Sequence, residues 1–243
     1  MIPLKGYTGM IDFHSHILPG IDDGSKCIED TLWMLKSSAS QGVETMVATP
    51  HFYPWKEYPS DFLERRNSSY NSILDSLKET ENLPNIVLGA EVHYYEGINN
   101  SDVIKKLAIE NTNYVLIEMP IVKWSNRMLE DLFKLSTQQN LTPIIAHIER
   151  YIKSQWGTKN LKLLFESGLP IQVNAESFLN KSTSRTVLKL LKKGNVHVIG
   201  SDCHNRTSRI PNMGEAASLI QEKLGKQYVE AINSFSESIL LQN

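Results

Sequence analysis

The sequence has few cysteines, no strong excess of charge and no long apolar run. Two cysteines among 243 residues, Cys27 and Cys203, are too few for a disulfide framework. The 25 Lys and Arg against 27 Asp and Glu leave a formal net charge of -2, so we do not expect nucleic acid to be bound through bulk electrostatics. Charged residues interrupt every apolar run before the roughly 18 residues that a membrane-spanning helix needs, so membrane insertion is not expected either.

Export signals and domain linkers are also missing from the sequence. The first residues show no charged start, apolar core and small-residue cleavage site, and together with the low cysteine content this predicts a cytoplasmic protein. We find no Gly/Ser-rich linker, no low-complexity block and no repeat of fixed period. The expected organisation is therefore one domain over residues 1–243.

Short β-branched apolar runs alternate with longer helical patterns, which is typical of repeated βα units. Seven runs are expected to be strands, at 10–13, 44–48, 85–90, 113–118, 142–146, 170–173 and 195–200. Helical patterns fall at 28–41, 61–77, 101–108, 126–139, 160–166 and 182–193, with two closing helices at 211–224 and 226–241. The predicted fold class is α/β.

Side chains that can bind metals follow the predicted strands where each strand ends. His14 and His16 close the first run, and because they lie two residues apart on a strand, their side chains point to the same face. The ends of later runs carry His51, Glu91, His147, Asp202 and His204. In a barrel of parallel strands the carboxyl ends converge on one rim, where so many imidazoles and carboxylates call for a cation. The pattern therefore predicts a metal site.

The ligand types restrict which metal is expected. Imidazole and carboxylate without thiolate suit divalent Mn, Fe, Zn or Mg, with Co as a further alternative. Asp23, in the loop Asp22-Asp23-Gly24, adds a carboxylate. These ligands exceed what one ion takes, so we expect two or three ions that share Glu91 as a bridge, an arrangement often used to displace a phosphoryl group.

Three nearby ionisable residues are expected to have other roles. Asp12 is in phase with the histidine pair but one layer deeper, so it should support the ligands rather than bind metal. His93 shares the face of Glu91 and could support a ligand or contact substrate. His197 alternates out of phase with Asp202 and is expected to be a core residue.

Taken together, these residues resemble a known family, the polymerase and histidinol phosphatase (PHP) superfamily. Within it, the chain is most similar to the bacterial manganese-dependent protein-tyrosine phosphatases of capsular and exopolysaccharide gene clusters. The resemblance extends from Met10 to the C-terminal helices. It is carried by Phe13-His14-Ser15-His16, Ile21-Asp22-Asp23-Gly24, Thr49-Pro50-His51, Gly89-Ala90-Glu91, Ala146-His147-Ile148-Glu149-Arg150-Tyr151 and Ser201-Asp202-Cys203-His204-Asn205.

The resemblance implies a distorted seven-stranded (β/α) barrel with a trinuclear site, Mn2+ being the expected ion. It places one metal on His14, His16, Glu91 and Asp202, a second on Glu91 and His147, and a third on Asp23, His51 and His204. It also implies that Arg150 and Arg209 bind phosphate. The chain departs from the family pattern in the aromatic stretch 52–59 and at His93, where tyrosine is frequent.

The implied reaction is hydrolysis of phosphotyrosine on the tyrosine-rich tail of a membrane-associated bacterial tyrosine autokinase, through which polysaccharide synthesis is regulated. Guanidinium forks match the oxygens of a phosphoryl group under attack. The leaving phenolate could take its proton from His204, Asp23 or a bound water, and the sequence does not choose among them. Aromatic residues of the 52–58 loop could stack on the tyrosyl ring.

Three alternatives follow from the same residues. Cys203 to Arg209 matches the C-x5-R signature of thiol-dependent tyrosine phosphatases, but the window lacks glycine. A small-molecule phosphatase, acting for example on histidinol phosphate, would keep the metal ligands. A catalytically silent metal-binding accessory module is the third alternative, against which the intact ligand positions speak.

Overall fold

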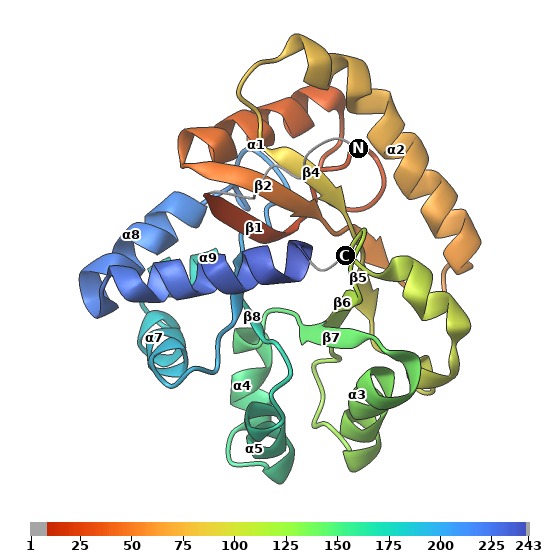
Figure 1. The fold of residues 1–243 in the computed structure, drawn as a ribbon, viewed down its shortest axis with the longest axis vertical. Helices are drawn as coiled ribbons and strands as arrows, with labels where there is room; N and C mark the ends of the chain where they lie inside the picture. Colours follow the sequence, from red (N-terminus) through yellow and green to blue (C-terminus); the bar gives the residue numbers. More distant parts are fainter. Residues whose placement is uncertain (1–8, 242–243) are drawn as a thin grey trace.

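The computed structural model describes residues 9–241, which fold as an α/β structure in which parallel strands are surrounded by helices (Figure 1). The described strands are β1 (Met10–Ser15), β2 (Val43–Ala48), β3 (His51–Phe52), β4 (Asn85–Leu88), β5 (Glu91–His93), β6 (Tyr114–Glu118), β7 (Thr142–Ile145), β8 (Gln172–Asn174) and β9 (Val198–Gly200). All of their pairings are parallel.

The strand count differs from the prediction, because nine strands form in residues 9–241 where seven were expected. Each of the seven predicted runs contains a strand, and two of them continue after a break. Thr49 and Pro50 separate β2 from β3, and Gly89 and Ala90 separate β4 from β5. Proline has no N–H to donate, and glycine weakens a strand, so pairing is interrupted at both places. The breaks lie immediately before His51 and Glu91.

The strands form three sheets, with the orders β1-β2-β4, β3-β5-β6-β7 and β8-β9. Isolated parallel bridges link Ile145 to Ile171 and Ser15 to Cys203, so the chain of neighbours leads from β7 through β8 and β9 back to β1. One apolar cluster gathers residues of β1, β2, β4, β6, β7 and β9 together with Ile239 and Leu240 of the last helix. A larger cluster lies between the strands and the helices around them.

The helices cover the outside of the strands (Figure 1). They are α1 (Ile28–Ser40), α2 (Pro59–Glu79), α3 (Asn126–Gln139), α4 (Glu149–Gln155), α5 (Lys159–Glu166), α6 (Ala175–Leu179), α7 (Ser184–Lys192), α8 (Met213–Leu224) and α9 (Lys226–Leu240), with the 3-10 helices η1 (Ile98–Asn100) and η2 (Asp102–Leu107). Side-chain caps begin two of them: Ser125 accepts from Met128 N, and Thr158 accepts from Leu161 N. No helix of residues 9–241 is both long and apolar enough to cross a bilayer.

Two short helices were not predicted. The helices α4 and α6 have seven and five residues, too few to show a clear period in the sequence. The pattern at 101–108 forms a 3-10 helix rather than an α-helix, as short segments often do. Both unpredicted helices come just after strands, α4 after three intervening residues beyond β7 and α6 immediately after β8, so they begin at the carboxyl ends of strands, where metal ligands are predicted.

Candidate metal centre

The predicted ligands come together at the carboxyl ends of the strands. Most of them are fully buried: His14, His16 and His147 are 0% exposed, and Glu91 and Asp202 are 1% and 3% exposed. Close approach of the backbone makes this possible. A Cβ on Gly200, at the end of β9, would lie 2.4 Å from the Cβ of His14, so only glycine lets β9 pass β1 here.

Glu91 lies at the centre of the group. Its Oε2 is 3.2 Å from His14 Nε2, 3.3 Å from His16 Nε2 and 3.0 Å from His51 Nδ1. Its other oxygen, Oε1, is 2.7 Å from His147 Nε2. One carboxylate therefore faces four imidazoles, which fits the bridging position predicted for it. Its role as a bridging ligand stays a prediction.

Glu118 belongs to the same group and was missed in the sequence. One ligand atom from each of Glu118, His51 and Glu91 lies within 4.8 Å of the other two, and Glu118 Oε1 is 3.7 Å from His147 Nε2. Glu118 is the last residue of β6 and is paired with His93 of β5, while Glu91, the first residue of β5, is paired with Leu116. The signal was present, because Glu118 is the last residue of a predicted strand run.

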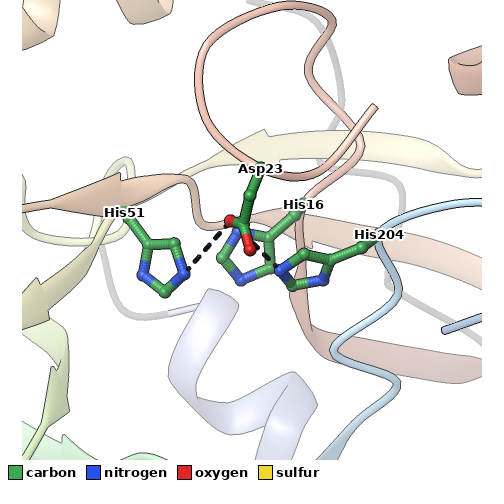
Figure 2. Close-up of side chains that lie close together, drawn as sticks. All are labelled: His16, Asp23, His51 and His204. Carbon is green, nitrogen blue, oxygen red and sulfur yellow. Dashed lines mark ion pairs between the residues drawn. The ribbon is translucent and has the colours of Figure 1, made fainter. Parts of the chain in front are cut away.

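A second set of ligand atoms surrounds Asp23. Figure 2 shows this side chain reaching from its loop toward His51 and His204, and its Oδ1 is 3.5 Å from the Nε2 atom of each. His16 completes the set, in which all ligand atoms lie within 4.8 Å of one another. The loop passes close to β1, since a Cβ on Gly24 would lie 2.3 Å from the His16 carbonyl oxygen. The three residues predicted for a third metal are thus neighbours.

Asp202 lies beside the histidine pair and also meets both predicted phosphate-binding arginines. Its Oδ1 is 3.6 Å from His14 Nε2 and 3.4 Å from His16 Nε2. Arg150 Nη2 donates to Oδ2 and Arg209 Nη2 pairs with Oδ1, each at 2.5 Å. A cavity of about 310 Å³ lies against both guanidinium groups and Asp202. Both arginines therefore reach the group of ligands, on one side of it.

Neighbouring polar side chains fix the orientation of the ligands. Asp22 Oδ2 pairs with His16 Nδ1 at 2.7 Å, and Gln172 Oε1 accepts from the backbone N–H of His147 at 2.6 Å. Tyr151 Oη is 3.1 Å from His147 Nδ1. Asn205 Oδ1 accepts the N–H of Arg209 at 3.2 Å and so shapes the loop that presents this arginine. Partners of this kind set the ring orientation of ligating histidines.

The charges of the cluster are strongly coupled. Burial raises the pKa of Glu91, but nearby histidines, His14 first among them, outweigh it and hold that pKa well below its ordinary value. Burial lowers the pKa of His14 and His16, while Glu91 beside the first and Asp22 beside the second bring the net pKa above the ordinary value. Burial keeps the pKa of His147 below its ordinary value. The neighbouring imidazoles therefore stabilise the ionised form of Glu91, a role that a bound cation can take over.

Several buried ligand atoms have no hydrogen-bond partner among the described residues. They are His51 Nδ1, Glu91 Oε2 and His204 Nε2. Glu91 Oε2 stands 3.0 Å from His51 Nδ1, yet the two atoms are not aligned as donor and acceptor. A buried polar atom without a hydrogen-bond partner destabilises a fold, and these three atoms all lie among the predicted metal ligands. The residues present therefore fit a site for divalent cations.

The thiol alternative does not fit the structure. Cys203 is 0% exposed, and burial raises the pKa of its thiol well above the ordinary value. A reactive thiolate needs the opposite, an exposed group with a lowered pKa. The following helix, α8, begins only at Met213, so Arg209 does not lie at a helix start.

Two of the predicted ligands hold an unusual backbone conformation. His147 has φ of 29° and Asp202 has φ of 53°, both in the left-handed region that non-glycine residues rarely adopt. Each lies two residues beyond the end of a strand, His147 after β7 and Asp202 after β9. Strain of this kind concentrates at functional sites.

The residues expected in other roles lie near their predicted places. Asp12 is fully buried and its Oδ1 accepts the N–H groups of Ser201 and His14, at 2.8 and 3.3 Å. His93 Nδ1 pairs with Glu118 Oε2 at 3.0 Å. His197 is partly buried against Phe235, away from the cluster. The supporting roles of Asp12 and His93 stay predictions, and His197, expected in the core, is only partly buried.

Aromatic rings lead from the cluster to the surface. The Tyr53 ring stacks on His51 with centroids 5.1 Å apart, and Trp55 lies 5.2 Å from Tyr53 and 4.8 Å from His93. Trp55 is 62% exposed. The aromatic stretch of the sequence therefore forms one wall beside the candidate site.

Comparison with known proteins gives matches over nearly the whole chain. A family model described as capsular polysaccharide synthesis, CpsB/CapC, matches residues 10–242. Tyrosine-protein phosphatase YwqE of Bacillus subtilis (strain 168) is 30% identical over 242 residues, covering 96% of this chain and 92% of that protein. Tyrosine-protein phosphatase CpsB of Streptococcus pneumoniae is 31% identical over 236 residues, covering 89% and 91%.

Solved structures also match this chain over nearly its whole length. One from the crystal structures of YwqE from Bacillus subtilis and CpsB from Streptococcus pneumoniae, described as unique metal-dependent tyrosine phosphatases, matches with a TM-score of 0.81 at 26% identity. It covers 96% of this chain and 95% of that one. The phosphotriesterase homology protein from Escherichia coli matches with a TM-score of 0.57 at 11% identity, covering 96% and 98%, a likeness of fold alone.

Proposed function

The chain belongs to the CpsB/CapC family of capsular polysaccharide synthesis, and we propose that it is a metal-dependent protein-tyrosine phosphatase. The observation that carries the proposal is the convergence of four imidazoles on Glu91, with buried ligand atoms that lack other partners. The relatives named above are tyrosine-protein phosphatases, and their structures are described as metal-dependent.

We assign the ligands to two or three divalent ions, with Mn2+ as the expected metal. His14, His16, Glu91 and Asp202 would hold one ion, Glu91 and His147 with the newly found Glu118 a second, and Asp23, His51 and His204 a third. When bound, such ions neutralise phosphoryl oxygens and lower the pKa of a water ligand from ~15.7 toward ~7. The donor set of imidazoles and carboxylates supports a hard or borderline divalent ion.

Arg150 and Arg209 are assigned to the phosphoryl group. Both guanidinium groups stand on one side of the cluster and face the cavity that Asp202 also lines. A guanidinium fork matches two phosphoryl oxygens at once, and the charge that spreads over these oxygens during in-line attack strengthens the bond. In this role the arginines exchange their contacts with Asp202 for contacts with phosphate.

His204 and Asp23 are assigned to the leaving group. As water attacks phosphorus, the bond from phosphorus to the tyrosyl oxygen breaks, and the phenolate with its pKa of ~10 needs only partial help from a proton donor. Asp23 is the most exposed member of the cluster, at 65%, and lies 3.5 Å from His204 Nε2. Burial lowers the pKa of His204 to about 3, so its imidazole carries no extra proton near pH 7, and a water that Asp23 and His204 hold would donate the proton to the leaving phenolate.

The remaining parts of the proposal concern the form of the sheets, the extent of the domain, the cellular location and the substrate. The bridges from β7 through β8 and β9 to β1 support a distorted barrel as the form of the sheets, with one domain over the chain. The predicted domain includes residues 1–8 and 242–243, which lie outside the described part. We place the enzyme in the cytoplasm, with the tyrosine-bearing tail of a membrane-associated kinase as substrate.

The test is turnover of three substrates by protein of known metal content. We expect p-nitrophenyl phosphate and a phosphotyrosine peptide to be hydrolysed, activity to vanish on chelation, and Mn2+ to restore it best. Histidinol phosphate serves as the small-molecule comparison. Preferred turnover of histidinol phosphate would replace the proposal by the small-molecule alternative. Metal binding without turnover of any substrate would favour the silent module.

A further inference from the structure

Positive charge is concentrated in one part of the chain. Residues 150–193 contain nine Lys and Arg but only two acidic residues, a net charge of +7, while the other residues together carry -9. All eight basic residues after Arg150 in this segment are exposed. Of these eight, only Lys162 has an ion pair with a described residue, Glu166 at 3.7 Å. The overall charge of -2 therefore conceals a strongly basic region.

This region contains a groove that begins at the candidate active site. The 310 Å³ cavity between Arg150 and Arg209 adjoins a second cavity of about 760 Å³, because Arg150 lines both. The second cavity is bounded by α4 and by residues at the start of α7, with Lys153 on its wall. The helices α4, α5 and α7 lie together on one side of the molecule (Figure 1).

Trp156 connects the second cavity to a third. This residue directly follows α4, is 74% exposed and lines both spaces. The third cavity, of about 780 Å³, has Lys159 and Lys193 on its walls. We call the second and third cavities together the basic groove, with Lys153, Trp156, Lys159 and Lys193 as its marker residues.

We propose that the basic groove binds the acidic flank of a phosphotyrosine peptide. The proposal rests on the proposed function and names the substrate class of the same site. A peptide whose phosphate lies between Arg150 and Arg209 can continue directly into the groove, since Arg150 belongs to both. Asp and Glu side chains on that flank then meet unpaired lysines, and Trp156 offers an apolar ring to the peptide chain.

An anionic membrane is the other partner with complementary charge. The marker lysines line concave spaces that continue from the site, which suits an extended chain better than a flat bilayer surface. The second cavity has Arg150 and Lys153 on its wall against Glu149, and the third has Lys159, Lys162 and Lys193 against Glu166, so basic groups outnumber acidic ones in both. We therefore commit to the peptide and let the membrane be an outcome of the test.

The experiment compares substrates that differ only in their flanks. The metal-loaded enzyme is given p-nitrophenyl phosphate, a phosphotyrosine peptide with neutral flanks, and two peptides with glutamates on either the N-terminal or the C-terminal side. We expect one acidic peptide to exceed the neutral one in kcat/KM on the order of tenfold, mainly through KM. Added NaCl should narrow the difference.

The variant Lys153→Glu/Lys159→Glu/Lys193→Glu should remove this preference and leave turnover of p-nitrophenyl phosphate unchanged. The matched control is Lys36→Glu/Lys105→Glu/Lys106→Glu, which changes net charge equally at exposed lysines that line neither part of the groove. Trp156→Ala should weaken all peptides severalfold and spare p-nitrophenyl phosphate.

Three results would overturn the inference. One is equal kcat/KM for acidic and neutral peptides in the unmodified enzyme, and another is a preference that survives the triple reversal. The third is sedimentation with vesicles of phosphatidylglycerol and phosphatidylcholine that the triple reversal abolishes, without any flank preference, which would assign the face to a membrane. Absence of turnover on p-nitrophenyl phosphate itself would instead refute the proposed function, and the inference with it.

Discussion

Charged side chains gather in two neighbouring regions of this molecule, and they differ in almost every physical respect. Around Glu91 the charges are buried, of both signs and within hydrogen-bonding distance of one another. Along α4, α5 and α7 they are mostly exposed, predominantly positive and mostly without partners in the described chain. Buried opposite charges act over short distances in a low dielectric, whereas exposed like charges are screened by water and salt. The first region should govern turnover and the second the choice of substrate.

The largest expected effect comes from removing the charge at the centre of the buried region. Glu91→Gln keeps the shape of the side chain but weakens a ligand that faces four histidines, so we expect kcat to fall on the order of a thousandfold together with bound metal. Steady-state kinetics and metal analysis of the same sample test this. Glu79→Gln, an exposed position at the end of α2, is the control. If the Glu91→Gln variant kept the kcat of the parent enzyme while holding no metal, the buried region would not govern turnover.

A second prediction concerns stability in the buried region. Burial raises the pKa of Asp12 from 3.8 to about 6. The stability that the protonated form contributes is fully present below about pH 4 and is lost as the pH rises through about 6. Asp12→Asn removes this loss, so between about pH 4 and pH 8 the free energy of unfolding should shift in favour of the variant by on the order of 3 kcal/mol.

Urea unfolding of chelator-treated protein at several pH values measures this difference. Asp75→Asn, at an exposed position on α2, should show no such trend. A constant difference between the Asp12 variant and the parent across this pH range would mean that Asp12 is not held in the buried state described here.

Arg150 and Arg209 stand at the border of the two regions, about one third exposed and bonded to buried Asp202. Arg→Lys at either position keeps the charge but loses the fork, so kcat/KM should fall about tenfold or more while metal content stays constant. Arg127→Lys, an exposed residue paired with Glu96, is the control. Wild-type kcat/KM in both lysine variants, or a loss only in proportion to lost metal, would leave phosphate binding to the metals alone.

The smallest effect is expected at Cys203, which lies inside the buried region without belonging to its chemistry. Cys203→Ser should change kcat less than about threefold, because the thiol is buried and protonated and is not the nucleophile. Kinetics of the purified variant, with circular dichroism to establish that it is folded, provide the measurement. A variant that folds but has no turnover would restore the thiol mechanism.

The sequence predicted the alternation of elements and the ligands at strand ends because both follow from local order. His14 and His16 share a face through the two-residue period of a strand, and that period holds in the structure. The two extra strands could not be foreseen, since whether β3 continues β2 depends on how far pairing with β5 extends beyond Pro50.

The parts of the site that the sequence did not reveal depend on contacts across the fold. Glu118 carries the local signal of a predicted strand end, but its place in the cluster depends on β6 lying between β5 and β7, an order of strands that no local pattern encodes. The approach of Arg150 and Arg209 to the same carboxylate likewise joins residues of α4 and of the loop after β9. The basic groove was hidden because net charge averages over the whole surface.

The left-handed backbone at His147 and Asp202 has a consequence for how this protein can change. A non-glycine residue in this conformation costs about 1 to 3 kcal/mol that glycine would avoid. His147→Gly and Asp202→Gly therefore relieve strain while deleting the functional groups. Breaking a buried ion pair costs about 3 to 5 kcal/mol, more than the strain that glycine would remove, so the contacts of Asp202 with Arg150 and Arg209 and of His147 with Glu91 hold both residues in this conformation. A glycine variant at either position is therefore expected to lose stability together with turnover.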